Sequence, residues 1–454
     1  MSKTQAEFWQ GRRVVVLGAA RSGIAAARFL KDKGNTVSLS DSGPISGEIK
    51  AELAELGIPW EEGGHTREWL TQAEAIIASP GIPLTAKPFQ WAQAEGIPVL
   101  SEIELAGQFL KIPVIAVTGS NGKTTTVTLI HALLTEAGLR AGLGGNIGTP
   151  LISFVGQELD WIVAELSSFQ LETTYSFKPQ IALLLNLYPN HLDRHPSMES
   201  YFEIKSRIFQ AQDANDWSLS NGDNPWCQAL SQHTKQPLQW FSRQAGPQVW
   251  AWIEAGQLWR QMPAGPEAVI ALPELPLLGN HNQENCLAVL AISARLKIPV
   301  EAVRRALKKV TGIPHRLEKV AELQGRVFIN DSKATNYLAT QKALESLEPP
   351  LILIAGGRDK GGDLHPLIDL IHSRVKAVVL LGEAAPHFAQ ELQKREYNQI
   401  SVVNTMQEAV EQAWRVSQPK DQILLSPACA SYDMFHNFEE RGERFKADVA
   451  ALTP

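Results

Sequence analysis

The segment Thr-Gly-Ser-Asn-Gly-Lys-Thr-Thr-Thr at residues 118–126 directly follows a short apolar run. Gly119 and Gly122 allow backbone N–H groups to approach phosphate oxygens, because no Cβ stands in the way. A helix that begins here adds the partial positive charge of its N-terminus. We therefore expect a strand, a phosphate-binding loop and a helix in succession, with Lys123 on the outer phosphates and the Thr124 hydroxyl on Mg²⁺.

This loop is shorter than the general P-loop pattern. Only two residues, Ser120 and Asn121, separate its glycines, where the general pattern has four. The alternative interpretation is a tight turn between a strand and a helix with an incidental lysine. The order of strand, glycines, lysine and hydroxyls favours ATP as the ligand.

Short apolar runs alternate with helical patterns along most of the chain. We expect strands at residues 14–17, 36–40, 75–78, 98–100, 114–117, 161–164, 181–187, 327–329, 351–354, 377–381, 401–403 and 422–425. This alternation predicts an α/β fold with parallel sheets covered on both faces. Residues 249–278, which are rich in tryptophan, proline and glycine, instead predict hairpins and an irregular linker.

The length of 454 residues indicates about three domains. We place them at residues 1–110, 111–312 and 313–454, with a hinge at 311–314. The first and third are expected to be Rossmann-like α/β domains, and the second a P-loop-like ATPase domain with a parallel sheet.

Composition excludes several classes of protein. The net charge of −6 argues against nucleic acid as the main partner, since binding to phosphate backbones needs a basic face. The three cysteines, at positions 227, 286 and 429, lack the spacing of a disulfide framework or a zinc site. We find neither a signal peptide nor an apolar run long enough to span a bilayer, so we expect a cytoplasmic protein that does not bind membranes.

A second glycine-containing turn, at residues 18–23, follows the first predicted strand, and Asp41 closes the next strand. This arrangement is compatible with dinucleotide binding, with Asp41 on a ribose. However, Ala20 stands where the central glycine of that motif lets the backbone approach a pyrophosphate. The turn alone therefore leaves its ligand open.

The shortened loop at 118–126 resembles that of the Mur ligase and folylpolyglutamate synthase superfamily. The resemblance extends over essentially the whole chain, and the motif series looks like that of the D-glutamate-adding members. The segments that carry it are Ser-Pro-Gly-Ile at 79–82, Gly-Gly-Asn-Ile-Gly at 144–148, Glu-Leu-Ser-Ser-Phe-Gln-Leu at 165–171, His-Leu-Asp-Arg at 191–194, His281 and Asn282 with Asn285, Pro-His-Arg at 314–316, Asn-Asp-Ser-Lys-Ala-Thr-Asn at 330–336 and Ser-Pro-Ala-Cys-Ala-Ser at 426–431.

The resemblance implies a reaction as well as a fold. It implies that ATP converts a substrate carboxylate to an acyl phosphate, which an amine then attacks to form an amide. The implied substrates are UDP-N-acetylmuramoyl-L-alanine, D-glutamate and ATP, and we expect a monomer. Such a site needs positioning and charge neutralisation more than a nucleophile.

The resemblance also implies the catalytic groups, namely Lys123, Glu165, His191, Lys205 and Lys333. Of these, Glu165 and His191 are implied as ligands of Mg²⁺ together with Thr124, and Lys205 as a carbamate that supports a second Mg²⁺. The residues alone leave other interpretations open: a structural salt bridge for Glu165, a loop histidine for His191 and a surface lysine for Lys205. Asn190 stands where the family usually has aspartate, and we leave its role open.

The remaining implied contacts fall into three sets. For the UDP substrate they are Arg21, Ser22, Gly23, Asp41, Ser42, Gly81, Asn146 and His191. For ATP they are Gly119, Ser120, Asn121, Gly122, Lys123, Thr124, Thr125, Asn282, Asn285, Arg316 and Asp331. For D-glutamate they are Thr335, Lys360, Ser431 and Phe438.

Three other functions compete with this prediction. The first is a sister ligase that adds L-alanine or a diamino acid, or folylpolyglutamate synthase. The second is a nicotinamide-dependent oxidoreductase built on the turn at 18–23, which would leave the loop at 118–126 without a purpose. The third is a nucleotide-gated interaction protein that has lost catalysis.

Overall fold

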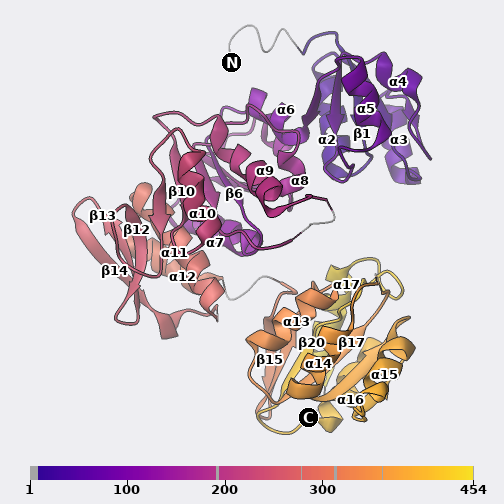
Figure 1. The fold of residues 1–454 in the computed structure, drawn as a ribbon, viewed down its shortest axis with the longest axis vertical. Helices are drawn as coiled ribbons and strands as arrows, with labels where there is room; N and C mark the ends of the chain where they lie inside the picture. Colours follow the sequence, from indigo (N-terminus) through magenta and orange to yellow (C-terminus); the bar gives the residue numbers. More distant parts are fainter. Residues whose placement is uncertain (1–8, 191–193, 278, 311–313, 360, 453–454) are drawn as a thin grey trace. The chain divides into compact units, whose positions relative to one another are not determined.

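The computed structural model describes residues 9–190, 194–277, 279–310, 314–359 and 361–452 (Figure 1). The chain divides into two compact units, Met1–Val310 and Thr311–Pro454. The first unit contains two sheets and the second contains one. The domain boundaries at 110 and 312 stay predictions, and residues 311–313 of the predicted hinge lie outside the described residues.

The first sheet is parallel, with strand order β3-β2-β1-β4-β5. Side chains alternate between its faces: Val14 and Val16 pack in one core cluster, and Val15 and Leu17 in another. The strands are β1 Arg13–Leu17, β2 Thr36–Ser40, β3 Trp60–Glu61, β4 Ala75–Ala78 and β5 Val99–Ser101, and the helices are α2 Arg21–Asp32, α3 Gly47–Glu55, α4 Arg67–Thr71 and α5 Lys87–Ala94.

The second sheet has strand order β14-β13-β12-β11-β10-β9-β6-β8-β7. It is parallel from β7 to β12 and continues as an antiparallel meander, which confirms the hairpins predicted at 249–278. Its strands are β6 Val114–Thr118, β7 Ala141–Gly145, β8 Trp161–Glu165, β9 Ile181–Leu184, β10 Trp217–Asn221, β11 Gln239–Phe241, β12 Val249–Glu254, β13 Gln257–Met262 and β14 Gly265–Ala271.

Helices cover both faces of this sheet (Figure 1). Helices α7, α11 and α12 share one core cluster with Ile115 and Val117, whereas α9 shares the other with Val114 and Ala116. The bounds are α6 Glu102–Phe109, α7 Lys123–Glu136, α8 Ser168–Leu171, α9 Met198–Gln210, α10 Pro225–Ala229, α11 Asn280–Arg295 and α12 Val300–Lys309, with short helices η1 Leu151–Phe154, η2 Leu230–Gln232 and η3 Leu272–Glu274.

Helix α6 joins the first sheet to the second through two buried carboxylates. Oε1 of Glu102 accepts a hydrogen bond from the N–H of Ile152 at 2.5 Å, and burial raises the pKa of Glu102 to about 7. The carboxylate of Glu104 accepts the N–H groups of three consecutive residues, 175–177, over 2.7 to 3.1 Å. Backbone amides in the segments around the second sheet are therefore hydrogen-bonded by side chains of α6, which precedes that sheet in the sequence.

The third sheet, in the second unit, has order β15-β16-β20-β17-β18-β19, and only the β15–β16 pair is antiparallel. Leu351 and Leu353 face one core cluster, and Ile352 and Ile354 face another. Its strands are β15 Glu318–Leu323, β16 Arg326–Asn330, β17 Leu351–Gly356, β18 Val375–Leu381, β19 Ile400–Val402 and β20 Gln422–Leu425, and its helices are α13 Tyr337–Ser346, α14 His365–Arg374, α15 Ala385–Lys394, α16 Met406–Val416 and α17 Phe438–Ala451.

The predicted fold class is confirmed: the three sheets are mainly parallel and flanked by helices. One expected strand, at 181–187, is shorter than predicted, because β9 ends at Leu184 and the next residues turn toward the glycine loop. Of the helices in the described residues, none is long and apolar enough to cross a membrane.

Candidate active site

The carboxyl ends of β6, β8 and β9 lie at one edge of the second sheet. Val117 of β6 pairs with Glu165 of β8, and Thr118 pairs with Leu184 of β9, all in parallel register. Parallel strands place the loops that follow them on the same side. The glycine loop and Glu165 are therefore neighbours although about forty residues separate them in sequence.

Both glycines of the loop have backbone angles that strain an L side chain, and both have close neighbours. Gly122 has φ +82°, and a Cβ there would lie 2.4 Å from Oδ1 of Asn285. Gly119 has φ +150°, and its Cβ would approach Leu185 and Asn186 within 3.1 to 3.3 Å. The predicted need for glycine at these positions thus has a direct steric cause.

Side chains from the segment after β9 and from α11 hold the loop. Oδ1 of Asn186 accepts the N–H of Asn121 at 2.9 Å, and the Ser120 hydroxyl donates to the carbonyl of Tyr188 at 3.0 Å. Asn285, which is buried, donates to Oδ1 of Asn282 at 3.2 Å in the first turns of α11. Of the predicted ATP contacts on α11, Asn285 lies directly against Gly122 of the loop, and Asn282 is hydrogen-bonded to Asn285.

Lys123 begins α7, immediately after Gly122. Its Nζ donates to the carbonyl oxygens of Gly119 at 2.8 Å and Ser120 at 3.0 Å. The ammonium group is thereby kept beside the loop and the N-terminus of α7, where positive charge is concentrated. Thr125, another predicted ATP contact, is buried in the first turn of the helix.

Glu165 ends β8 and is 2% exposed. Its Oε2 accepts the hydroxyl of Thr124 at 2.8 Å, and its Oε1 accepts Nδ2 of Asn146 at 2.9 Å. Asn146 follows β7, where Gly145 has φ +94° and lies against the carbonyl of Glu165. This buried carboxylate is held by two neutral donors and forms no salt bridge with the described residues, so a cation suits it as a further partner.

Lys205 is fully buried, which contradicts the interpretation as a surface lysine. It lies on the apolar face of α9, one turn after Tyr201, and is 1% exposed. Nζ donates to Oγ1 of Thr118 and the carbonyl oxygen of Gly119, each at 3.1 Å. Burial, together with the nearby charge of Lys123, holds the pKa of Lys205 well below its usual value.

The turn at residues 18–23 is packed against the following strands. A Cβ on Gly18 would lie 2.6 Å from Oγ of Ser79, and one on Gly23 would lie 2.0 Å from the carbonyl of Gly18. Asp41 closes the turn, accepting the N–H of Ala19 at 2.6 Å and of Gly43 at 2.7 Å. Its carboxylate therefore orders the backbone as well as being a predicted substrate contact.

The other predicted UDP contacts lie near this turn. Arg21 and Ser22 begin α2, and Nη1 of Arg21 donates to the carbonyl of Gly148 at 3.2 Å. This contact connects the turn to the segment that carries Asn146. Ser42 is exposed directly after β2, and the carbonyl of Gly81 accepts Nη1 of Arg194 at 3.4 Å.

In the second unit, Asp331 follows β16 and is buried. It accepts the N–H of Leu317 at 3.2 Å and the hydroxyl of Ser426 at 2.8 Å. Burial raises its pKa to about 7, against the opposing charge of Arg316. Asp331 and Arg316, both predicted ATP contacts, are thus electrostatic neighbours.

Lys333 and Phe438 are also brought together in the second unit. Nζ of Lys333 lies 5.7 Å from the ring centroid of Phe438, which begins α17. Thr335 follows in the same loop as Lys333, and Ser431 is 2% exposed after β20. Two further predicted residues, His191 and Lys360, lie outside the described residues.

Several residues next to the site were missed by sequence reasoning. The hydroxyls of Ser120 and Tyr201 form a hydrogen bond at 3.4 Å, and Arg441, which is buried, donates to Oγ of Ser332 at 2.9 Å and to the Ser332 carbonyl at 2.8 Å. Glu172 and Arg194 form a buried ion pair. The available signal was polar residues within otherwise apolar helical patterns, which is weak without the fold.

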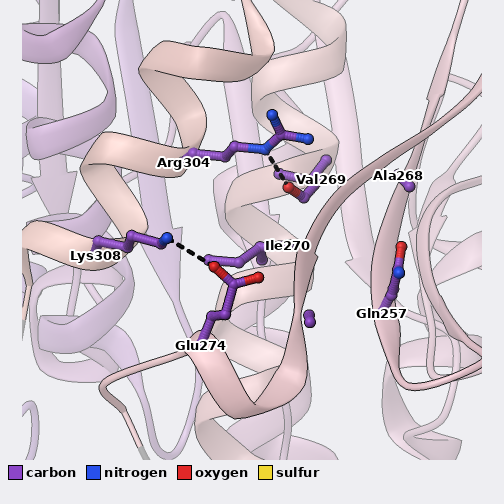
Figure 2. Close-up of a pocket in the computed structure, with 8 residues that line it drawn as sticks. Gln257, Ala268, Val269, Ile270, Glu274, Arg304 and Lys308 are labelled. Atoms are coloured by element: carbon purple, nitrogen blue, oxygen red, sulfur yellow. Dashed lines mark hydrogen bonds and ion pairs between the residues drawn. The ribbon is translucent and has the colours of Figure 1, made fainter.

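A separate cavity of about 340 Å³ lies between β13, β14, η3 and α12 (Figure 2). Arg304 donates from Nε to the carbonyl of Val269 at 2.6 Å, and Lys308 pairs with Glu274 at 2.7 Å. None of the predicted site residues is among those that line this cavity. Its charged groups already have partners, so it does not compete with the loop as the candidate active site.

Family models match most of the chain. The Mur ligase MurD-like N-terminal domain matches residues 12–101, the Mur ligase middle domain 117–293, and the Mur ligase glutamate ligase domain 315–429. The chain belongs to the Mur ligase family.

Curated relatives resemble the chain over nearly its full length. A UDP-N-acetylmuramoylalanine–D-glutamate ligase from Pelotomaculum thermopropionicum is 42% identical, over 97% of this chain and 98% of its own. The ligase of the same name from Koribacter versatilis is 40% identical, over 98% of each. A crystal structure of MurF from Acinetobacter baumannii, 18% identical, has a TM-score of 0.61 over 99% of this chain and 98% of its own, which supports the fold.

Proposed function

We propose that this Mur ligase uses ATP to join D-glutamate to UDP-N-acetylmuramoyl-L-alanine in cytoplasmic peptidoglycan precursor synthesis. The products are the amide, ADP and phosphate. The observation that supports this proposal best is the contact of Thr124 with the buried Glu165 beside the glycine loop. The names of the relatives at 40–42% identity support the choice of substrates.

The loop and α7 would bind the phosphates of ATP. Backbone N–H groups of residues 119–122 and the N-terminus of α7 favour anionic oxygens, and Lys123 adds a full charge next to them. These groups stabilise the negative charge on the γ-phosphoryl group and on the departing ADP oxygen as the phosphoryl group passes to the substrate carboxylate and the acyl phosphate forms. The amine of D-glutamate then attacks the acyl carbon, and phosphate leaves.

The side-chain oxygens of Thr124 and Glu165 suit Mg²⁺, which prefers oxygen ligands. A hydroxyl and a buried carboxylate lie 2.8 Å apart there, beside the predicted phosphate site. His191 is the third proposed ligand. When bound, Mg²⁺ would neutralise phosphate charge during phosphoryl transfer.

Lys205 is proposed to carry a carbamate. Its lowered pKa favours the neutral amine, whose nitrogen can add to the carbon of CO₂ with loss of one proton to solvent. The product would place an anion beside Gly119 and Thr118. A negative oxygen at this position would support a second Mg²⁺.

The two ends of the substrate pair are assigned to different sheets. Arg21, Ser22, Gly23, Asp41, Ser42, Gly81 and Asn146 are proposed to bind the UDP part. Thr335, Lys360, Ser431 and Phe438, with Lys333, are proposed to bind D-glutamate. We further propose that the enzyme acts as a monomer.

Amino-acid-dependent release of ADP tests the proposal. Purified protein, ATP and Mg²⁺ are combined with UDP-N-acetylmuramoyl-L-alanine and, in turn, D-glutamate, L-glutamate or a diamino acid. Of these amino acids, we expect only D-glutamate to cause release of ADP. Release only with another amino acid, or only with UDP-N-acetylmuramate and L-alanine, would assign the chain to a sister reaction.

A further inference from the structure

Arg194 holds the turn at residues 80–82, which lies between β4 and α5. Its Nη2 donates to the carbonyl oxygens of Ile82 at 2.8 Å and Pro80 at 3.4 Å, and its Nη1 donates to that of Gly81 at 3.4 Å. One guanidinium thereby binds three successive carbonyls. The turn follows β4 of the first sheet, whereas Arg194 precedes α9, which packs against the second sheet.

Glu172 holds the same guanidinium from the other side. Its Oε1 accepts Nε of Arg194 at 3.0 Å, and its Oε2 accepts Nη2. The side chains of Arg194 and Glu172 are 12% and 5% exposed, and the guanidinium carbon lies 4.8 Å from the ring centroid of Phe169. This bidentate and stacked geometry needs the planar fork of arginine, which lysine does not have.

The pair is connected to the phosphate loop by packed side chains. His195, the next residue, forms a hydrogen bond with Ser168 at 3.0 Å, and its ring lies 5.1 Å from that of Tyr201. The Tyr201 hydroxyl forms a hydrogen bond with the Ser120 hydroxyl of the loop at 3.4 Å. A continuous series of contacts therefore runs from the turn at 80–82 to the loop that is proposed to bind ATP.

We propose that Arg194, held by Glu172, is a positioning residue that fixes the turn at 80–82 relative to the phosphate loop. The proposal rests on the proposed function, in which Gly81 contacts the UDP part of the substrate. A fixed turn sets the position of the UDP part of the substrate, and hence the position of the substrate carboxylate relative to ATP. Small displacements of a bound reactant are costly, so a loosened turn should affect binding of the UDP substrate first.

Steady-state kinetics of Arg194→Lys, Arg194→Ala and Glu172→Gln test this role. We expect the KM for UDP-N-acetylmuramoyl-L-alanine to rise about tenfold in Arg194→Ala and nearly as much in Arg194→Lys, with the KM values for ATP and D-glutamate within about twofold. Arg207→Ala is the matched control. Arg207 donates to the carbonyls of Leu171 and Glu172, at the same helix end, but among the described residues it forms no hydrogen bond or ion pair with residues 80–82.

Amide hydrogen exchange gives a readout that needs no turnover. Peptides that cover residues 79–86 should exchange faster in Arg194→Ala than in the wild type or in Arg207→Ala. Unchanged exchange there, or a rise in all three KM values together with a lower unfolding temperature, would overturn the proposal. If the wild type instead uses another substrate pair, the function assigned above fails, while the exchange result still decides whether Arg194 fixes the turn.

Discussion

The hydroxyl of Thr124, in the first turn of α7, lies 2.8 Å from the carboxylate of Glu165, which ends the neighbouring strand β8. The contact joins the helix that starts at the phosphate loop to a carboxylate that the fold has removed from water. The proximity of Thr124 and Glu165 is the geometric basis for the proposed Mg²⁺ site.

Glu165→Gln should weaken Mg²⁺ binding while leaving the fold intact. Glutamine can keep the hydrogen bonds to its neighbours but removes the negative charge, so we expect the Mg²⁺ concentration for half-maximal activity to rise at least about tenfold. A magnesium titration of ADP release measures this. Glu158→Gln is the control, since the Glu158 side chain is 92% exposed. Equal magnesium dependence in both variants would remove Glu165 from the metal site.

Lys205→Ala should lower kcat by roughly a hundredfold, the order of magnitude for loss of one preorganised charged group. The wild type should slow down in buffers stripped of CO₂ and recover when bicarbonate is added, whereas the variant should not respond. Lys235→Ala, at an exposed lysine, should behave like the wild type. A Lys205→Ala protein with full activity that bicarbonate does not raise would contradict the carbamate.

Gly122→Ala should destabilise the protein more than Gly138→Ala. Both glycines have similar positive φ, +82° and +79°, so alanine costs each about 1 kcal/mol. Only Gly122 has a neighbour in the way, Oδ1 of Asn285 at 2.4 Å, whereas the space at Gly138 is open. Thermal unfolding of both variants measures the difference. Asn285→Ala combined with Gly122→Ala should recover the stability that is lost through the steric clash. Equal losses of stability in Gly122→Ala and Gly138→Ala would argue against the close contact.

Glu102→Gln should change how stability depends on pH. Burial raises the pKa of Glu102 to about 7 in the folded chain, so the folded state keeps a proton that the unfolded state loses above pH 4.5. The wild type should therefore lose on the order of 3 kcal/mol relative to the variant as pH rises from 4.5 to 7.5. Urea unfolding across this range tests the sign. Glu48→Gln, also in the first turn of a helix but exposed, should show no such trend.

Much of the fold followed from local patterns, because buried parallel strands are continuous apolar runs. The strands that were missed show the limit of that signal. Strand β7 reads Ala-Gly-Leu-Gly-Gly, a poor strand sequence, yet Gly142 and Gly144 are needed because Phe154 fills the space where their side chains would lie. Such a requirement is set by a residue on another element and cannot be read from the strand itself.

The candidate site likewise contains residues that could be predicted from the sequence and residues that could not. The glycine loop could be predicted because its residues are contiguous and each has its own chemical reason. The burial of Lys205 could not, since a lysine within an amphipathic helix normally faces solvent. The pairing of Arg194 with Glu172 also depends on how two separate segments pack, and no local spacing indicates it.

The two carboxylates of α6 also bear on how enzymes of this architecture could exchange parts. Glu102 and Glu104 belong to the segment between the matched N-terminal and middle domains, yet the amides they bind lie in the middle domain. In a recombinant chimera that takes both the first sheet and α6 from another enzyme, those amides would face side chains from the other parent. A crossover just before Ser101 keeps helix and amides from one parent, so the natural seam for grafting precedes this helix.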